Sequence, residues 1–270
     1  MFRALSIDHG SARCIRFICR RGLTGNSMKA VLFDLGHTLI NYHNDWRDPE
    51  RRAVGKVARR VCDASPDGVA PDQVSEYLLD LLEQGRKVKL EEHLEIPLVD
   101  VLGNCFHRFA VEGDEELMEQ SLGEFYAVLL EHREIVPGTN DMLQFVKDND
   151  FKIGLVSDVA WGLPSYFPQR DMKFYHLDEY FDDLVFSTDV GLRKPNPKIF
   201  KIALSNLGER AECTYFVGNN LQADILGALN VGMVAVLKES SFYAHDDEIV
   251  PDAKVSTWDQ FEELLCQAGP

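Results

Sequence analysis

The chain has 270 residues, of which 45% are apolar and 27% are charged, and its formal net charge is −16. This composition provides for a large core and for two domains, and the acidic balance argues against a nucleic acid or an anionic membrane as partner. A small anionic molecule is not excluded, because it responds to local fields at strand ends and helix N-termini. We therefore expect a small-molecule substrate, and the oligomeric state is not predicted.

The six cysteines are scattered along the chain without a CxxC pair, and no histidine lies at zinc-finger spacing. This pattern predicts reduced thiols and a cytoplasmic protein. No apolar run is long enough to span a bilayer.

Residues 1–27 carry five arginines and one acidic residue, which distinguishes them from the acidic remainder. We interpret them as a disordered extension or as the product of a misassigned start codon, because Met28 directly precedes the first strand. A transit peptide would also be basic, but this segment has few serines and no clear amphipathic helix.

Val31, Leu32 and Phe33 form an apolar run that ends at Asp34. The run predicts a buried strand of the parallel type, and a carboxylate at its end lies where open α/β sheets bind ligands. Many strands end in an aspartate that only caps the following turn. The strand ends further along the chain therefore decide between the two interpretations.

The segment 42–135 contains no convincing strand, and its apolar residues recur at helical spacing, as Val74, Leu78 and Leu82 do. We predict an all-helical cap over residues 42–135 and a core made of residues 28–41 and 136–270. An insert that begins directly after the first strand would overhang the carboxyl edge of the sheet and cover Asp34. The alternative is that it packs on the flank of the sheet and covers nothing.

Strands and helices alternate in the remainder of the chain. The predicted strands are Lys152–Ser157, Leu184–Ser187, Thr214–Gly218 and Met233–Leu237. The predicted helices are Asn140–Lys147, Asn196–Asn206, Leu221–Asn230 and Trp258–Cys266. This order is typical of the α/β class and predicts a doubly wound parallel sheet with helices on both faces.

Polar residues follow three of these later strands: Ser157 and Asp158 the second strand, Lys194 the third, and Asn219 and Asp224 the fourth. Together with the Asp34 segment they occur in the order of the haloacid dehalogenase (HAD) superfamily, which the chain resembles from about Lys29 to its C-terminus. The segments that carry the resemblance are 33–39, 155–157, 194–200 and 224–228. The resemblance implies a Rossmann-like hydrolase core with a helical cap inserted after the first motif.

The resemblance also implies a set of catalytic roles. Asp34 would be the nucleophile of a phosphoryl transfer and would form an aspartyl-phosphate. Ser157 would donate a hydrogen bond to a phosphoryl oxygen, and Lys194 would neutralise the oxyanion and hold Asp34 ionised. Thr38 would fix the loop that follows the nucleophile. Taken alone, Ser157 fits an ordinary turn residue and Lys194 fits a solvated surface charge.

Magnesium is the cofactor that the resemblance implies. It would bind Asp34, the main-chain carbonyl of Gly36, Asn219 and Asp224, a set of hard oxygen ligands. Asp224 on its own also fits an acidic residue in the first turn of a helix. For the substrate, further contacts are expected from Asp158 and Trp161.

Two positions depart from the usual phosphatase pattern. Gly36 stands where the family has a second aspartate, which protonates the leaving group, and such general acid–base help is worth roughly 10²- to 10⁴-fold in rate. His37 is a conceivable substitute, although a turn histidine directed to solvent is the favoured interpretation. Asn219 stands where a second aspartate is usual, so magnesium is expected to bind weakly.

Three functional hypotheses follow. The favoured one is a magnesium-dependent phosphatase of small phosphomonoesters. The second is a dehalogenase that hydrolyses a carbon–halogen bond, a reaction that needs neither magnesium nor the second acid. Dehalogenases that resemble this chain, however, usually have tyrosine where Phe200 stands. The arginine that would bind the halide is not identified either, since Arg47, Arg51 and Arg52 are only nearby candidates. The third is an impaired catalyst that acts as a binding protein. The identity of the substrate is not predicted.

Overall fold

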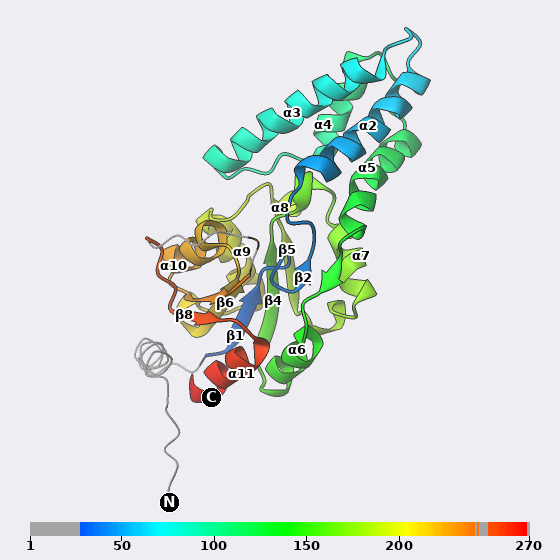
Figure 1. Cartoon of the computed structure of the whole chain (residues 1–270). Helices are drawn as coiled ribbons and strands as arrows, with labels where there is room; N and C mark the ends of the chain where they lie inside the picture. Colours follow the sequence, from blue (N-terminus) through cyan, green and yellow to red (C-terminus); the bar gives the residue numbers. More distant parts are fainter. Residues whose placement is uncertain (1–27, 241, 243–247, 269–270) are drawn as a thin grey trace, which may run out of the picture.

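The computed structural model describes residues 28–240, 242 and 248–268, so the prediction for residues 1–27 lies outside the described residues (Figure 1). Within these residues six strands form one parallel sheet in the order β5-β4-β1-β6-β7-β8. The strands are β1 (Ala30–Phe33), β4 (Lys152–Ser157), β5 (Asp183–Phe186), β6 (Thr214–Gly218), β7 (Val234–Lys238) and β8 (Ala253–Val255). The predicted α/β class with a parallel sheet is confirmed.

Strand β1 lies in the middle of the sheet and is buried along its whole length. Because side chains alternate across a strand, Val31 and Phe33 face one layer of the core, whereas Ala30 and Leu32 face the other. The first layer includes residues of α6 (Thr139–Asp148), α7 (Tyr166–Phe174) and α11 (Trp258–Ala268). The second includes residues of α9 (Pro197–Leu207) and α10 (Leu226–Val231). A strand covered on both faces has to be apolar on both, which explains the unbroken apolar run of β1.

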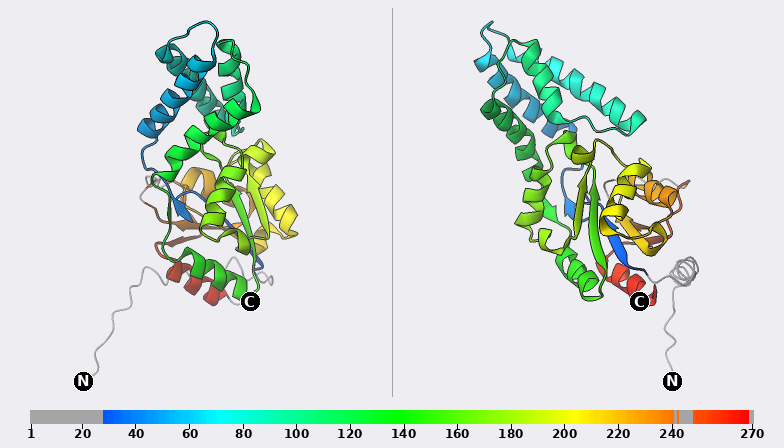
Figure 2. Two further views of the ribbon diagram at one scale, coloured as in Figure 1. Left: turned by 90° about the vertical axis from the view of Figure 1, so that its right-hand side faces the viewer. Right: turned by 180° about the vertical axis from the view of Figure 1, so that it is seen from behind.

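Four helices follow one another along the chain before α6 and stand above the carboxyl ends of the strands (Figures 1 and 2). They are α2 (Arg47–Ala64), α3 (Pro71–Glu92), α4 (Leu98–Arg108) and α5 (Glu115–Leu130). Helix α2 packs between α3 and α5, and apolar residues of the four helices continue the core layer of α6 and α11 without a break. We call the segment α2–α5 the insert.

A two-stranded antiparallel ribbon lies at the base of the insert, formed by β2 (Ile40–Asn41) and β3 (Glu134–Ile135). It joins the chain segment that enters the insert to the segment that leaves it. The described residues also include the short elements η1 (Ala160–Gly162), η2 (Asp178–Tyr180), α8 (Ser187–Val190) and η3 (Ala211–Cys213).

Several elements differ from the sequence-based expectation. Helix α7 and strands β2, β3 and β8 were not predicted, because the three strands have only two or three residues and Pro168 interrupts the pattern of α7. The helix predicted from Leu221 begins instead as a π-helical segment, η4 (Leu221–Ile225), before α10. Of the helices that the structure describes, none combines the length and apolar character needed to span a bilayer.

A buried carboxylate fixes the base of the insert to the core. Asp171 on α7 is 1% exposed, and its oxygens accept hydrogen bonds from Tyr42 Oη (2.7 Å), Tyr126 Oη (2.6 Å) and Arg133 Nη1 (2.6 Å). Tyr42 precedes the insert, Tyr126 belongs to α5 and Arg133 follows the insert. One core side chain therefore holds both connections and the last helix of the insert.

Replacing Asp171 with alanine is expected to lower the free energy of unfolding by about 3–5 kcal/mol, because Arg133 is left as an uncompensated, largely buried charge. Urea denaturation followed by circular dichroism measures this loss. Lys173→Ala, an exposed position on the same helix, is the matched control and should leave the midpoint almost unchanged. Equal midpoints for the two variants would contradict the proposed role of Asp171.

Candidate active site

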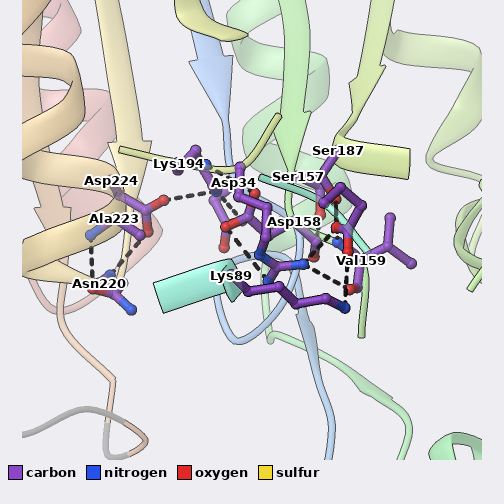
Figure 3. Close-up of polar contacts among 12 residues, drawn as sticks. Asp34, Lys89, Ser157, Asp158, Val159, Ser187, Lys194, Asn220, Ala223 and Asp224 are labelled. Carbon is purple, nitrogen blue, oxygen red and sulfur yellow. Dashed lines mark hydrogen bonds and ion pairs between the residues drawn. The ribbon is translucent and has the colours of Figure 1, made fainter. Parts of the chain in front are cut away.

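Asp34 directly follows β1, and its carboxylate contacts Lys194 (Figure 3). Its main-chain N–H donates to Val217 O at 2.9 Å, which aligns it with the end of β6. One carboxylate oxygen, Oδ2, accepts from Thr38 Oγ1 at 2.9 Å, and the other, Oδ1, accepts from Lys194 Nζ at 2.6 Å. The carboxylate is therefore oriented by a hydroxyl group and by an ammonium group.

Lys194 is 5% exposed, and its ammonium group contacts three acceptors. Besides Asp34 it donates to Val156 O at 2.9 Å and lies 2.7 Å from Asp224 Oδ1. Burial alone would lower the pKa of Lys194, but the carboxylates of Asp224, Asp34 and Asp158 outweigh burial and raise it. Lys194 is therefore a permanent cation between two carboxylates.

Asp224 approaches the site from the segment after β6. It is 1% exposed, and its Oδ2 accepts from the main-chain N–H of Asn220 at 2.9 Å. A Cβ atom at Gly218 would lie 2.5 Å from this carboxyl group, so only glycine permits the approach. Burial raises the pKa of Asp224, against the opposing effect of Lys194.

Ser157 is the last residue of β4 and Asp158 follows it, so both lie at the end of the strand that pairs with β1. The Ser157 hydroxyl is nearly buried and makes a long 3.4 Å contact to Asp158 O, so it lies beside the nucleophile without binding it. Asp158 accepts from the main-chain N–H of Lys194 at 3.1 Å, and burial raises the pKa of this carboxyl group. The side chain of Asp158 thus anchors the lysine loop.

A cavity of about 790 Å³ lies between the sheet edge and the insert. Its core wall includes Asp34, Ser157, Asp158, Lys194, Asn219 and Asp224. Its opposite wall includes Trp46, which directly precedes α2, together with Arg86, Lys89, Leu90 and Leu129 of the insert. The insert therefore covers Asp34 rather than the flank of the sheet, and the strand-end residues predicted from the sequence meet in one place.

The site offers oxygen donors suited to magnesium. The buried carboxylates of Asp34 and Asp224 both contact the ammonium group of Lys194, whereas the half-buried Asp158 also lies 3.7 Å from Arg193 Nη2. Asn219 Oδ1 lies 3.4 Å from Thr38 Oγ1, and Asn219 Nδ2 is buried without a hydrogen-bond partner in the described part of the chain. Among the described residues no cluster of three or more His, Cys, Asp or Glu side chains could hold a metal, so a metal here would need the amide and main-chain oxygens as well.

Gly36 and His37 are the two positions that bear on the proton donor for the leaving group. Apart from its chain neighbours, no heavy atom lies within 4 Å of the position that a Cβ would take at Gly36, so the structure leaves room for a Cβ there. His37 is 8% exposed, has a φ of 58° and stacks on Phe242 with ring centroids 3.8 Å apart. Burial lowers the pKa of His37 to about 4 despite the nearby Asp34. The favoured interpretation of His37 as a solvent-directed turn residue was wrong, and its imidazole is neutral at pH 7.

Trp161 does not line the large cavity. Its indole N–H donates to Glu50 Oε2 of α2 at 2.7 Å, and its ring packs edge-on against Trp46, directly before α2, and against Phe125 of α5. Trp161 thus connects the insert to the core instead of contacting the cavity. The three arginines considered for a halide, Arg47, Arg51 and Arg52, are also absent from the cavity wall, whereas Arg86 and Arg193 belong to it.

The comparisons with known proteins agree with this architecture. A model of the haloacid dehalogenase-like hydrolases matches residues 28–232. A glyceraldehyde 3-phosphate phosphatase of Methanothermobacter thermautotrophicus is 35% identical over 223 residues, which cover 79% of this chain and 86% of that protein. A pyrimidine 5'-nucleotidase of Escherichia coli is 33% identical over 134 residues, which cover 49% of this chain and only 57% of that protein.

Among solved structures, a HAD phosphatase from Thermococcus onnurineus has a TM-score of 0.59 and 25% identity, over 88% of this chain and 98% of that chain. The chain belongs to the haloacid dehalogenase-like hydrolase family. It is a hydrolase, as the resemblance of its motifs implied.

Gly218→Ala is expected to destabilise the protein, because the new methyl group would displace the buried Asp224 carboxylate. Such overpacking costs about 1–3 kcal/mol, and the free energy of unfolding in urea measures it. Gly123→Ala on α5 is the control, since nothing lies within 4 Å of its Cβ and alanine is the better helix former by about 0.5–1 kcal/mol. A Gly218→Ala protein as stable as Gly123→Ala would show that Asp224 is not held as described.

Proposed function

We propose that the protein is a magnesium-dependent phosphatase that hydrolyses small phosphomonoesters through an aspartyl-phosphate on Asp34. The observation that carries the proposal is the Asp34 carboxylate held by Lys194 and Thr38 on the floor of a covered cavity. Phosphatases recur among the relatives, including the glyceraldehyde 3-phosphate phosphatase that is similar over most of the chain. We expect the substrate to be a small phosphorylated metabolite.

The chemistry divides hydrolysis into two displacements at phosphorus. An oxygen of Asp34 attacks, a bond between this oxygen and phosphorus forms, and the bond to the leaving oxygen breaks with its electron pair. Water then attacks the phosphorus of the aspartyl-phosphate, which returns the carboxylate and releases inorganic phosphate. Lys194 keeps Asp34 ionised in the resting site and offsets charge on the phosphoryl oxygens, while the Ser157 hydroxyl donates to one of them.

Asp34, the main-chain carbonyl of Gly36, Asn219 and Asp224 would hold the magnesium ion. The ion would supply positive charge and orientation for the phosphoryl oxygens. The two buried carboxylates of Asp34 and Asp224 share one ammonium group, that of Lys194, which supports a divalent cation at this place. Asn219 contributes an oxygen without a charge, so weak binding is expected.

The described site has no evident side chain that protonates the leaving group. Gly36 has no side chain to donate a proton, and His37 is neutral at pH 7. The leaving oxygen therefore takes its proton from water, or leaves as a stable anion. We expect the protein to prefer phosphate esters of acidic alcohols and phenols.

Asp34→Asn is expected to abolish phosphate release from p-nitrophenyl phosphate, because the amide is neither a nucleophile nor an ionised partner for Lys194. The assay compares the full chain and the variant with magnesium and with EDTA, and chelation should remove the activity of the unaltered protein. If the unaltered protein releases no more phosphate than Asp34→Asn does, the phosphatase proposal is rejected.

The other hypotheses are separated by two further measurements on the same preparations. Chloride release from 2-chloropropionate that survives EDTA would indicate a dehalogenase. If neither phosphate nor chloride is released and calorimetry detects no magnesium binding, the protein is a binding protein with the hydrolase fold.

Gly36→Asp is expected to increase turnover of an alkyl phosphate by roughly 10²- to 10⁴-fold, because it installs the missing proton donor in space that the structure leaves open. The gain with p-nitrophenyl phosphate should be much smaller, since its leaving group hardly needs a proton. Gly36→Asn has a similar volume without the acid and should show neither gain. The measurement is kcat for both substrates, and an equal change for both would mean that leaving-group protonation does not limit the reaction.

A further inference from the structure

The loop between α3 and α4 of the insert reaches down to the loop that carries Lys194. Leu94 and Leu192 form an antiparallel bridge. The main-chain N–H of Glu95 donates to Gly191 O at 3.1 Å, and that of Arg193 donates to His93 O at 2.9 Å. Residues 93–95 and 191–193 are thus paired like two short strands, one from the insert and one from the core.

The carboxylate of Glu95 lies at the centre of this contact, and its side chain has no solvent exposure. From the core it receives Arg193 Nη1 and Ser187 Oγ, each at 2.5 Å. From the insert it receives Lys89 Nζ at 2.8 Å and the main-chain N–H of Ile96 at 3.0 Å. A buried ion pair of this kind is a weak source of stability, because desolvation offsets most of the attraction. Its geometry instead specifies how the insert and the core meet.

Gly162 gives independent evidence that this contact is built closely. It has a φ of +80°, and a Cβ atom there would lie 2.2 Å from Ile96 O and 3.0 Å from Glu95 Oε1. Only glycine combines this backbone conformation with so near an approach. The core backbone is therefore shaped to receive the loop of Glu95.

The lysine loop is held from two sides. On the core side, Asp158 accepts from the main-chain N–H of Lys194 at 3.1 Å, and Arg193 Nη1 also donates to Val159 O at 3.2 Å. On the insert side stand Glu95 and His93. Figure 3 shows Lys89 from the insert and Ser187 from the core converging on one region beside Asp158, next to the pair of Asp34 and Lys194.

We propose that Glu95 is a positioning residue: through Arg193 it holds the backbone before Lys194, so that the catalytic lysine is in place only while the insert is docked on the core. If the insert moves away, Arg193 loses both the carboxylate and the His93 carbonyl, and the segment before Lys194 loses its pairing. Docking over a substrate and completion of the site are then one event. The tests by turnover and phosphate binding rest on the proposed function, whereas the hydrogen-exchange test does not.

The experiment compares Glu95→Gln with Glu119→Gln in the full chain. Glu119 is the matched control, because it also joins the insert to a core side chain, Tyr166 Oη at 2.5 Å, but far along the chain from the lysine loop. Hydrogen exchange read by mass spectrometry measures the amides of residues 191–194. Calorimetry with inorganic phosphate and magnesium measures binding, and assays with p-nitrophenyl phosphate give kcat and KM.

We expect faster exchange at residues 191–194 in Glu95→Gln, together with a phosphate affinity and a kcat that fall by about 10- to 100-fold, the range that a small displacement of a catalytic group produces. KM should change less than kcat, and Glu119→Gln should match the unaltered protein in every measurement. In a Lys194→Met background Glu95→Gln should cause no further loss of phosphate affinity, because it acts through that lysine. A merely structural role would lower the melting temperature without this dependence on Lys194.

The proposal is overturned if Glu95→Gln keeps the exchange and affinity of the unaltered protein, if Glu119→Gln has an equal effect, or if the loss persists in the Lys194→Met background. Should Glu95→Gln not fold, Arg193→Lys tests the proposal instead, because it keeps the charge and removes the guanidinium group that pairs with Glu95. Unaltered hydrogen exchange at residues 191–194 in Arg193→Lys also overturns the proposal. If the unaltered protein neither binds phosphate nor releases it, the phosphatase proposal fails, and the exchange comparison alone supports or rejects the coupling.

Discussion

The ammonium group of Lys194 lies between the carboxylates of Asp34 and Asp224, and the rest of the site depends on this contact. Two buried carboxylates so close together would repel each other and favour protonation. The ammonium group of the lysine offsets this repulsion, because it lies 2.6 Å from Asp34 and 2.7 Å from Asp224. Gly218 leaves room for Asp224, Asn220 donates to it, and Asp158 holds the main chain of the lysine itself, so the surrounding loops maintain one arrangement of charges.

The insert is attached to the core through side chains as well as through its chain connections. Asp171 ties the entering and leaving segments to α7, and Glu95 ties the far loop of the insert to the lysine loop. Both carboxylates are buried and both accept from an arginine. The insert is thus anchored both at its base and at the loop of Glu95, and the roof of the cavity is physically connected to the chemistry below it.

The site has charge and orientation but lacks a proton donor for the leaving group. Gly36 leaves space where an acid would fit, and His37 is stacked on Phe242 and neutral. Such an arrangement favours substrates whose leaving group is stable as an anion.

The sequence by itself determined the sheet and the meeting point of Asp34, Lys194 and Asp224, because buried strands leave a local apolar pattern and the carboxyl ends of parallel strands converge at one edge. It also indicated a helical insert from residue spacing alone. Only the tertiary structure decided that Trp161 joins the insert to the core, that His37 is buried, and that Glu95 meets Arg193. Trp161 and its partner Glu50 are 111 positions apart in the chain, and Glu95 and Arg193 are 98 apart. Such contacts depend on how the insert docks, and docking follows from the packing of whole surfaces, for which no local pattern in the sequence exists.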